Sequence, residues 1–190
     1  LSRGLGDVYK RQILISFLSV FNLNSQIEPN PLFSDNMILQ RNSDVNVWGK
    51  ADKGKDLSLS VSWSDKTYTT KVNNDGSWRL NIATPSEGGP YQIDILCNDN
   101  VLKIKNVMIG EVWVASGQSN MEMTLSGFNR EPVLRSLDMI AKANNPKIRL
   151  LTVKKTFSDV DSTDLKAIGV NQITKQLLHL VQLPILLPIT

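Results

Sequence analysis

The residues with the clearest chemical potential follow an apolar run near the middle of the chain. Residues 107–116, VMIGEVWVAS, are almost continuously apolar, and Gly117, Gln118, Ser119 and Asn120 come directly after them. Such a run predicts a strand that is covered on both faces. In a parallel sheet, Ser119 would lie just beyond the carboxyl end of that strand and at the start of the next helix. Unpaired backbone N–H groups there would stabilise the negative oxygen that forms when a serine hydroxyl attacks an ester.

A purely structural interpretation of these residues stays open. Ser119 and Glu122 have the spacing of a capping box, in which the serine caps a helix and the glutamate reaches back. Gly117 would allow a tight turn in either case, because glycine has no side chain to clash. Spacing alone favours the cap, since such boxes are common, and it does not exclude a nucleophile.

The part of the chain before the motif predicts a β-structure. Residues 57–63, LSLSVSW, alternate apolar and serine residues, which indicates a half-buried strand with Leu57, Leu59, Val61 and Trp63 on one face. Further strands are predicted at residues 67–72, 77–82, 88–98 and 101–107. Turns are predicted at residues 64–66, 73–76 and 98–100, and the second of these, NNDG, has the composition of a hairpin. Several short strands with a turn between each predict an antiparallel β-sandwich over residues 27–106.

The pattern changes after residue 107. Residues 131–145 place Val133, Leu134 and Leu137 at helical spacing, together with Ile140 and Ala141. Pro132 suits the first turn of this helix, and Asn-Asn-Pro ends it. Residues 147–153 then predict another strand. This succession of strand, helix and strand predicts an α/β domain with a parallel sheet over residues 107–166.

Aromatic residues suggest a second class of function. Trp48, Trp63 and Trp78 could line a sugar-binding surface, because aromatic rings stack on the apolar faces of sugars. The alternative is that they belong to the core, which is favoured because Trp63 shares the apolar face of its strand. The sandwich could thus act as a carbohydrate-binding or interaction module without catalysis.

Composition excludes several other classes of function. The chain has 190 residues and a formal net charge of +3, and its basic residues are scattered, so nucleic acid is not an expected partner. Cys97 is the only cysteine and His179 the only histidine, so no internal disulfide and no metal site built from these residue types can form. Cys97 falls on the apolar face of its predicted strand and is expected to be a buried, unreactive thiol. No metal and no cofactor are expected.

The first residues have the pattern of a processing segment. Lys10 and Arg11 precede an apolar run at residues 13–21, which is too short to span a bilayer, and polar residues follow. This layout predicts a secretory signal over residues 13–26, hence a secreted or periplasmic protein that leaves the membrane once the signal is removed. A buried strand is the alternative. Residues 1–12 fit neither and are interpreted as an adapter or assembly artefact.

Several ordered motifs carry a resemblance to a known family. Residues 110–123, GEVWVASGQSNMEM, closely resemble the nucleophile block of the sialate O-acetylesterase family, among the SGNH/GDSL-like hydrolases. The agreeing stretches elsewhere are PLFSDNMILQR, VNVWGKA, DGSWRLNI, GGPYQIDI and NPKIRLLTV. Together the resemblance covers roughly residues 30–164.

The resemblance implies a fold and an activity. The fold would be an N-terminal antiparallel β-sandwich followed by the beginning of an SGNH-hydrolase-like α/β domain, of the flavodoxin-like three-layer type and incomplete here. The activity would be that of a serine esterase that removes O-acetyl groups from a sugar or glycan, with Ser119 as nucleophile. The N–H of Ser119 would contribute to the oxyanion hole, and Gln118 and Asn120, with Gly117, would shape the turn and pocket. In the family, the histidine that acts as general base lies in a later block, which this chain does not contain.

The last residues fit nothing that precedes them. Residues 167–190 lack the features that the family shows at this point, and a neighbouring reading frame can restore them, so a frameshifted tail is predicted. His179 lies in this tail and is not expected to act as the base. We therefore expect a fragment with little or no esterase activity, and a non-functional gene fragment is a further alternative.

Overall fold

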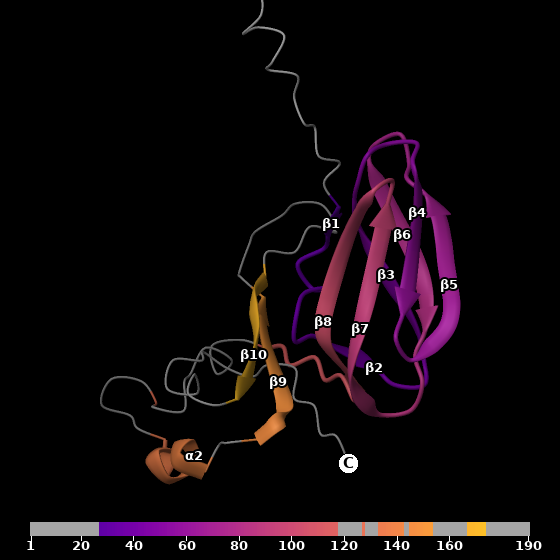
Figure 1. Ribbon diagram of the computed structural model, residues 1–190. Coiled ribbons are helices and arrows are strands. Elements are labelled where there is room, and N and C mark those ends of the chain that lie inside the picture. The colour runs from indigo at the N-terminus through magenta and orange to yellow at the C-terminus, as the bar shows by residue number, and fades with distance from the viewer. Residues whose placement is uncertain (1–26, 118–126, 128–132, 143–144, 154–166, 174–190) are drawn as a thin grey trace, which may run out of the picture.

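The computed structural model describes residues 27–117, 127, 133–142, 145–153 and 167–173 (Figure 1). Its strands form sheets of three, five and two strands. The three-stranded sheet has the order β1 (Glu28–Pro29), β3 (Asp44–Lys50) and β6 (Ser77–Ala83). The five-stranded sheet has the order β2 (Ile38–Gln40), β8 (Asn100–Gly110), β7 (Gly88–Cys97), β4 (Asp56–Val61) and β5 (Ser64–Lys71). The third sheet pairs β9 (Asn145–Val153) with β10 (Ala167–Ile173).

One hydrophobic core holds the two larger sheets together. Leu57, Leu59 and Val61 alternate with polar residues along β4, so all three face inward and are at most 5% exposed. Val47 on β3 and Ile82 on β6 enter the same core from the three-stranded sheet. The two sheets therefore lie against each other as a sandwich (Figure 1), which confirms the predicted β-architecture.

The pairing within the sandwich is antiparallel with one exception. β2 runs parallel to the last part of β8, with Ile38 opposite Met108 and Gln40 opposite Gly110. β7 and β8 form an antiparallel hairpin around the turn that was predicted after Cys97. Cys97 itself is fully buried in the core, as predicted.

The first hairpin turns earlier than the sequence predicted. The turn between β4 and β5 consists of Ser62 and Trp63, and Val61 pairs with Ser64. The prediction of a turn at residues 64–66 is therefore wrong, because two residues suffice to close a tight hairpin. As a result Trp63 lies in the turn and not in the strand.

The NNDG turn does not close a hairpin. Gly76 has φ +81°, and the carboxylate of Asp75 accepts hydrogen bonds from the N–H of Ser77 at 2.9 Å and from its hydroxyl at 2.7 Å. The turn was predicted correctly, but it joins β5 of one sheet to β6 of the other. The hairpin prediction is wrong because turn residues fix the local bend and not the partner of the next strand.

Strand β8 continues through the position at which the sequence predicted a new domain. Val107 and Ile109 are fully buried in the sandwich, opposite β7. The strand then ends at Gly110, where β2 stops pairing with it, and β7 begins only opposite Ile109. Residues 111–117 form neither helix nor strand. The prediction of one strand over residues 107–116 is therefore wrong, because no neighbouring strand continues beyond Gly110 to accept its hydrogen bonds.

A helix follows before the next strand, but it is shorter than predicted. Helix α2 spans Ser136–Lys142, whereas the sequence predicted a start near Pro132. Its predicted apolar stripe is exposed among the described residues, with Leu134 86% and Leu137 78% accessible. The helix prediction is thus confirmed for residues 136–142 of the segment.

Within the described residues, the strands after α2 do not show the predicted parallel pairing. β9 pairs with β10 in the antiparallel sense, with Ala167 opposite Val153. β10 also lies in the stretch, residues 167–190, that the sequence predicted to be a frameshifted tail. The α/β domain and the frameshift both stay predictions. Among the residues with described structure, no helix has the length and apolar character needed to cross a membrane.

Candidate functional site at the end of strand β8

The predicted site residues lie just beyond a well-defined part of the molecule. Gly117 is exposed at the end of the segment 111–117. Gln118, Ser119 and Asn120 lie outside the described residues, as does Glu122 of the alternative capping box. The prediction that a strand ends directly before Ser119 is wrong, because β8 already ends at Gly110. The described site is therefore the place where the chain leaves β8 towards Ser119.

A group of polar side chains surrounds this exit from the sheet. The side-chain amide of Gln40 donates a hydrogen bond to Oε2 of Glu111 at 3.0 Å, and its oxygen accepts one from the N–H of Val112 at 2.8 Å. Nε of Arg41 donates to Oε1 of Glu111 at 2.6 Å, and its Nη1 donates to Glu87 at 2.8 Å. Both carboxylate oxygens of Glu111 thus accept hydrogen bonds, one from Gln40, the last residue of β2, and one from Arg41, which follows it.

These contacts favour the ionised forms of Glu111, Glu87 and Arg41. The hydrogen bond from Gln40, and next the one from Arg41, hold the pKa of Glu111 below its ordinary value. The pKa of Glu87 is also lowered, first by backbone hydrogen bonding and then by Arg41. The two carboxylates in turn raise the pKa of Arg41, with the hydrogen bond to Glu111 as the largest cause. All three side chains are therefore charged at neutral pH.

A second polar contact joins β9 to the sandwich. Arg149 is only 3% exposed, and its guanidinium donates to the backbone oxygen of Asn36 and to Oδ1 of Asn106, both at 3.2 Å. The side-chain amide of Asn106 donates to Oδ1 of Asn36 at 2.6 Å. Nε of Arg149 has no hydrogen-bond partner among the described residues, and burial lowers the pKa of Arg149. Three polar side chains thus fix the position of β9 against the sandwich.

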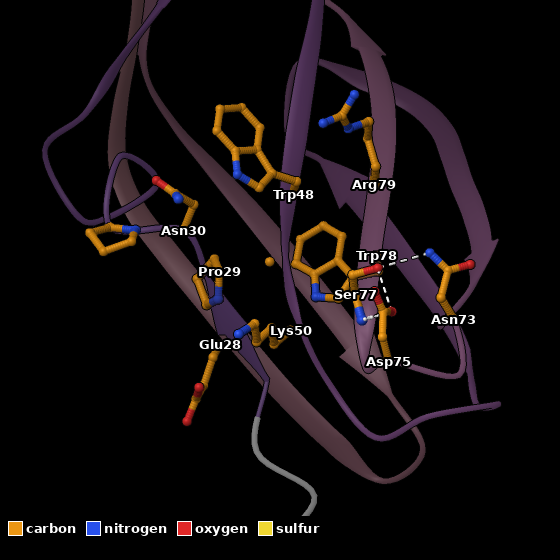
Figure 2. A pocket seen from close by; sticks show the side chains of 12 residues that line it. Glu28, Pro29, Asn30, Trp48, Lys50, Asn73, Asp75, Ser77, Trp78 and Arg79 are labelled. Carbon is orange, nitrogen blue, oxygen red and sulfur yellow. Dashed lines mark hydrogen bonds between the residues drawn. The ribbon is translucent and has the colours of Figure 1, made fainter. Parts of the chain in front are cut away.

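A cleft of about 710 Å³ lies at one end of the three-stranded sheet (Figure 2). Trp48 on β3 and Arg79 on β6 are paired residues of neighbouring strands and stand side by side on its wall. Asn73, Asp75 and Ser77 are joined by hydrogen bonds on another side. Trp48 packs edge-on against Phe33 with ring centroids 4.9 Å apart, and its indole N–H is buried without a partner in the described part of the chain.

The tryptophans do not form a common sugar-binding surface. Trp78 is 2% exposed and belongs to the core, so the structural alternative is confirmed for it. Trp63 packs against Tyr91 and donates its indole N–H to the backbone oxygen of Ala83 at 3.1 Å. Trp48 alone lines the cleft with a partly exposed ring. The favoured interpretation, that the tryptophans belong to the core, is therefore confirmed, because Trp48 and Trp63 pack against the same core that contains Trp78. Trp48 and Trp78 both line the cleft, and Trp63 does not.

Sequence reasoning missed the residues that organise the exit from β8. Gln40 and Glu111 are 71 positions apart, and nothing in the alternation of either strand indicates that their side chains meet. The one available signal was Glu111 itself, a charged residue that interrupts a run of apolar ones. Arg149 was missed in the same way, as one of two basic residues in the otherwise largely apolar strand β9.

The remaining sequence predictions about chemistry concern residues outside the described part. His179 lies there, so its expected lack of a role is not tested. Within the described ranges, no group of three or more histidine, cysteine, aspartate or glutamate side chains is arranged to hold a metal ion.

Comparison with known proteins relates the chain to esterases. No family model matches it. It is 26% identical over 139 residues to the sialate O-acetylesterase of Rattus norvegicus, which covers 68% of this chain and 26% of that protein. It is 28% identical over 145 residues to the sialate O-acetylesterase of Homo sapiens, covering 71% of this chain and 27% of that protein. The chain therefore spans about a quarter of the length of these relatives.

A solved structure agrees with these sequence matches. The crystal structure of a carbohydrate acetylesterase from Xanthomonas citri aligns with a TM-score of 0.70 and 26% identity, over 78% of this chain and 33% of that one. The resemblance read from the sequence motifs is thus confirmed by independent comparisons of sequence and of structure. The chain is therefore similar, in sequence and over the aligned part of its fold, to sialate O-acetylesterases and to a carbohydrate acetylesterase.

Proposed function

We propose that this chain carries the nucleophile of an esterase that removes O-acetyl groups from sugars. The observation that supports this most directly is the Gly117-Gln118-Ser119-Asn120 block in a chain whose relatives are named sialate O-acetylesterases. The solved relative from Xanthomonas citri is named a carbohydrate acetylesterase, which supports an acetylated sugar or glycan as the substrate class. An exported location is part of the proposal, because residues 13–26 have the layout of a secretory signal.

In this proposal the hydroxyl oxygen of Ser119 attacks the carbonyl carbon of the acetyl ester. A bond forms between serine and the acetyl group, and the sugar leaves as an alcohol after it takes up a proton. Water then hydrolyses the acetyl-serine and releases acetate. The N–H of Ser119 donates to the negative oxygen of each tetrahedral intermediate, while Gly117, Gln118 and Asn120 shape the turn that presents it.

The chain alone is proposed to turn over slowly. A serine hydroxyl stays protonated at neutral pH and is a weak nucleophile unless a neighbouring base accepts its proton. The resemblance implies that this base is a histidine of a later block, and His179 is not assigned the role. Imidazole added to the solution can substitute for such a missing side chain as proton acceptor.

The test compares acetyl release from a chromogenic acetyl ester by the unmodified chain and by Ser119→Ala, with and without added imidazole. We expect imidazole to raise the rate more with the unmodified chain than with Ser119→Ala. Mass spectrometry after treatment with an organophosphorus fluoride in the presence of imidazole should locate the adduct on Ser119. Ser116→Ala, an exposed serine in the preceding segment, is the matched control and should behave as the unmodified chain does. Equal rates for Ser119→Ala and the unmodified chain, with no adduct at Ser119, would overturn the proposal.

A further inference from the structure

The segment 111–117, which leads from β8 towards Ser119, is held neither by sheet hydrogen bonds nor by burial in the core. Residues 111–117 take part in no sheet, and Trp113 and Val114 on this segment are 59% and 82% exposed. Neither ladder hydrogen bonds nor burial in the core therefore holds the segment against the sandwich. A loop of this kind is free to sample many directions unless side chains hold its first residues.

Gln40 supplies the contact that the sheet no longer provides. It is the last residue of β2, which runs parallel to β8 and ends opposite Gly110. Its side-chain oxygen accepts the N–H of Val112 at 2.8 Å, in place of the backbone oxygen that a longer β2 would offer. Its amide nitrogen at the same time donates to Glu111 at 3.0 Å. One side chain thus orients two successive residues of the departing chain.

Arg41 completes the arrangement from the next position. Its own N–H donates to the backbone oxygen of Gly110 at 2.9 Å, and its guanidinium bonds Glu111 at 2.6 Å. Glu87 bonds the other side of the same guanidinium at 2.8 Å and so fixes its orientation. The Arg41 and Glu111 side chains are 36% and 35% exposed. Ion pairs this exposed contribute little to the free energy of unfolding. The inference therefore rests on where these side chains hold the backbone and not on the energy of the ion pair.

We propose that Gln40, Arg41 and Glu111 form a clasp that positions the segment leading to Ser119. The part of this inference that concerns catalysis rests on the proposed function, whereas the positioning of residues 111–117 does not. The three side chains are positioning residues, because they act through the backbone that carries the serine. A displacement of about 1 Å at a reacting group can lower a rate by about a hundredfold.

The test measures amide hydrogen exchange of Val112 by NMR in the full chain and in Gln40→Met. Methionine keeps the length and packing of the side chain but removes both polar atoms. We expect the Val112 amide to exchange at least about fivefold faster, the effect of losing one hydrogen bond. Gln92→Met is the matched control, since Gln92 bonds Asp94 on β7 and does not contact the segment. Its Val112 exchange should equal that of the unmodified chain.

A second pair of variants separates positioning from general stability. Glu111→Ala and Glu87→Ala each remove a carboxylate from Arg41, but only Glu111 belongs to the departing segment. We expect Glu111→Ala to shift the amide signals of residues 112–117 and to slow organophosphorus labelling of Ser119 about tenfold or more. Glu87→Ala should change both only slightly, and the melting temperatures of the two variants should be similar.

The outcomes distinguish this inference from the proposed function. Unchanged Val112 exchange in Gln40→Met, together with unchanged signals of residues 112–117 in Glu111→Ala, would overturn the clasp. Absence of any Ser119 labelling in the unmodified chain, even with imidazole added, would overturn the proposed function, and the NMR measurements would still decide the clasp. Faster amide exchange in Gln40→Met that is confined to residues 111–117, with the amides of β4 and β7 still protected, would support the clasp.

Discussion

At the scale of single residues, the charged side chains around the end of β8 depend on the position of Glu111 in the chain. Glu111 follows the last residue of the strand directly, so its carboxylate reaches Gln40 and Arg41 before the chain departs. The sequence could show that a charge interrupts the apolar run. It could not show the partners, because a contact between side chains about 70 positions apart leaves no periodic pattern.

The lowered pKa of Glu111 predicts a dependence of stability on pH. A carboxylate with a folded-state pKa below its unfolded value stabilises the fold above the unfolded value of about 4.3, and this contribution is lost as the pH falls through the folded-state pKa. Glu111→Gln should therefore melt below the unmodified chain at pH 7, and the difference should shrink below about pH 4. Melting temperatures measured by circular dichroism between pH 7 and pH 3 check this. A difference that stays constant over that range would contradict it.

At the scale of secondary structure, the sequence predicted strands well and their partners poorly. Alternation identified β4 and β7 because Leu57, Leu59 and Ile95 must all reach one core. It could not reveal that the NNDG turn changes sheets, or that β8 runs on through Val107, because pairing depends on distant strands. For the same reason the antiparallel partner of β9 was not foreseen.

The contact between β9 and the sandwich leads to a prediction for Asn106. Its Oδ1 accepts a hydrogen bond from the buried guanidinium of Arg149, which meets no carboxylate among its described contacts. Asn106→Asp would place a negative charge there, and charged hydrogen bonds are stronger than neutral ones by about 1 kcal/mol. Asn36, whose side-chain oxygen now accepts from the Asn106 amide, would turn its own amide nitrogen towards the new carboxylate. We expect a higher melting temperature at pH 7, with the gain lost when the aspartate is protonated.

Asn98 offers a matched control for this substitution. Like Asn106 it has a positive φ, 53° against 57°, and it belongs to the same sheet, in the turn between β7 and β8. Asn98→Asp therefore tests the backbone effect without the arginine. A similar change in melting temperature for both variants would show that Arg149 is not responsible.

At the scale of the whole molecule, the sandwich is the better-buried part and the segment around α2 is the more exposed. The chain spans about a quarter of its curated relatives, and the solved relative shares its fold over 78% of this chain. The sandwich core contains most of the buried apolar residues, whereas Leu134, Leu137 and Met139 are exposed by 49% or more. Exposed apolar side chains gathered on one segment favour association.

This exposure predicts how the chain behaves in solution. Replacing Leu134 and Leu137 by lysine should reduce concentration-dependent association, because it removes apolar surface without touching the core. The melting temperature should hardly change, since surface substitutions usually alter stability by less than about 0.5 kcal/mol. Sedimentation velocity over a range of concentrations measures the association. Val101→Lys, an exposed apolar position on β8, is the control and should leave association as it is.

The parallel pairing of β2 with β8 has a consequence for how the protein is made. Residue 40 can meet residue 111 only after the strands between them in the sequence have been synthesised, because β2 pairs with β8 and not with the strand that follows it in the chain. Contacts between such distant positions slow folding, because closing the long loop between them costs conformational entropy. We expect substitutions that destabilise the sandwich core to weaken the contact between residues 40 and 111 as well, because that contact requires β2 and β8 to be paired.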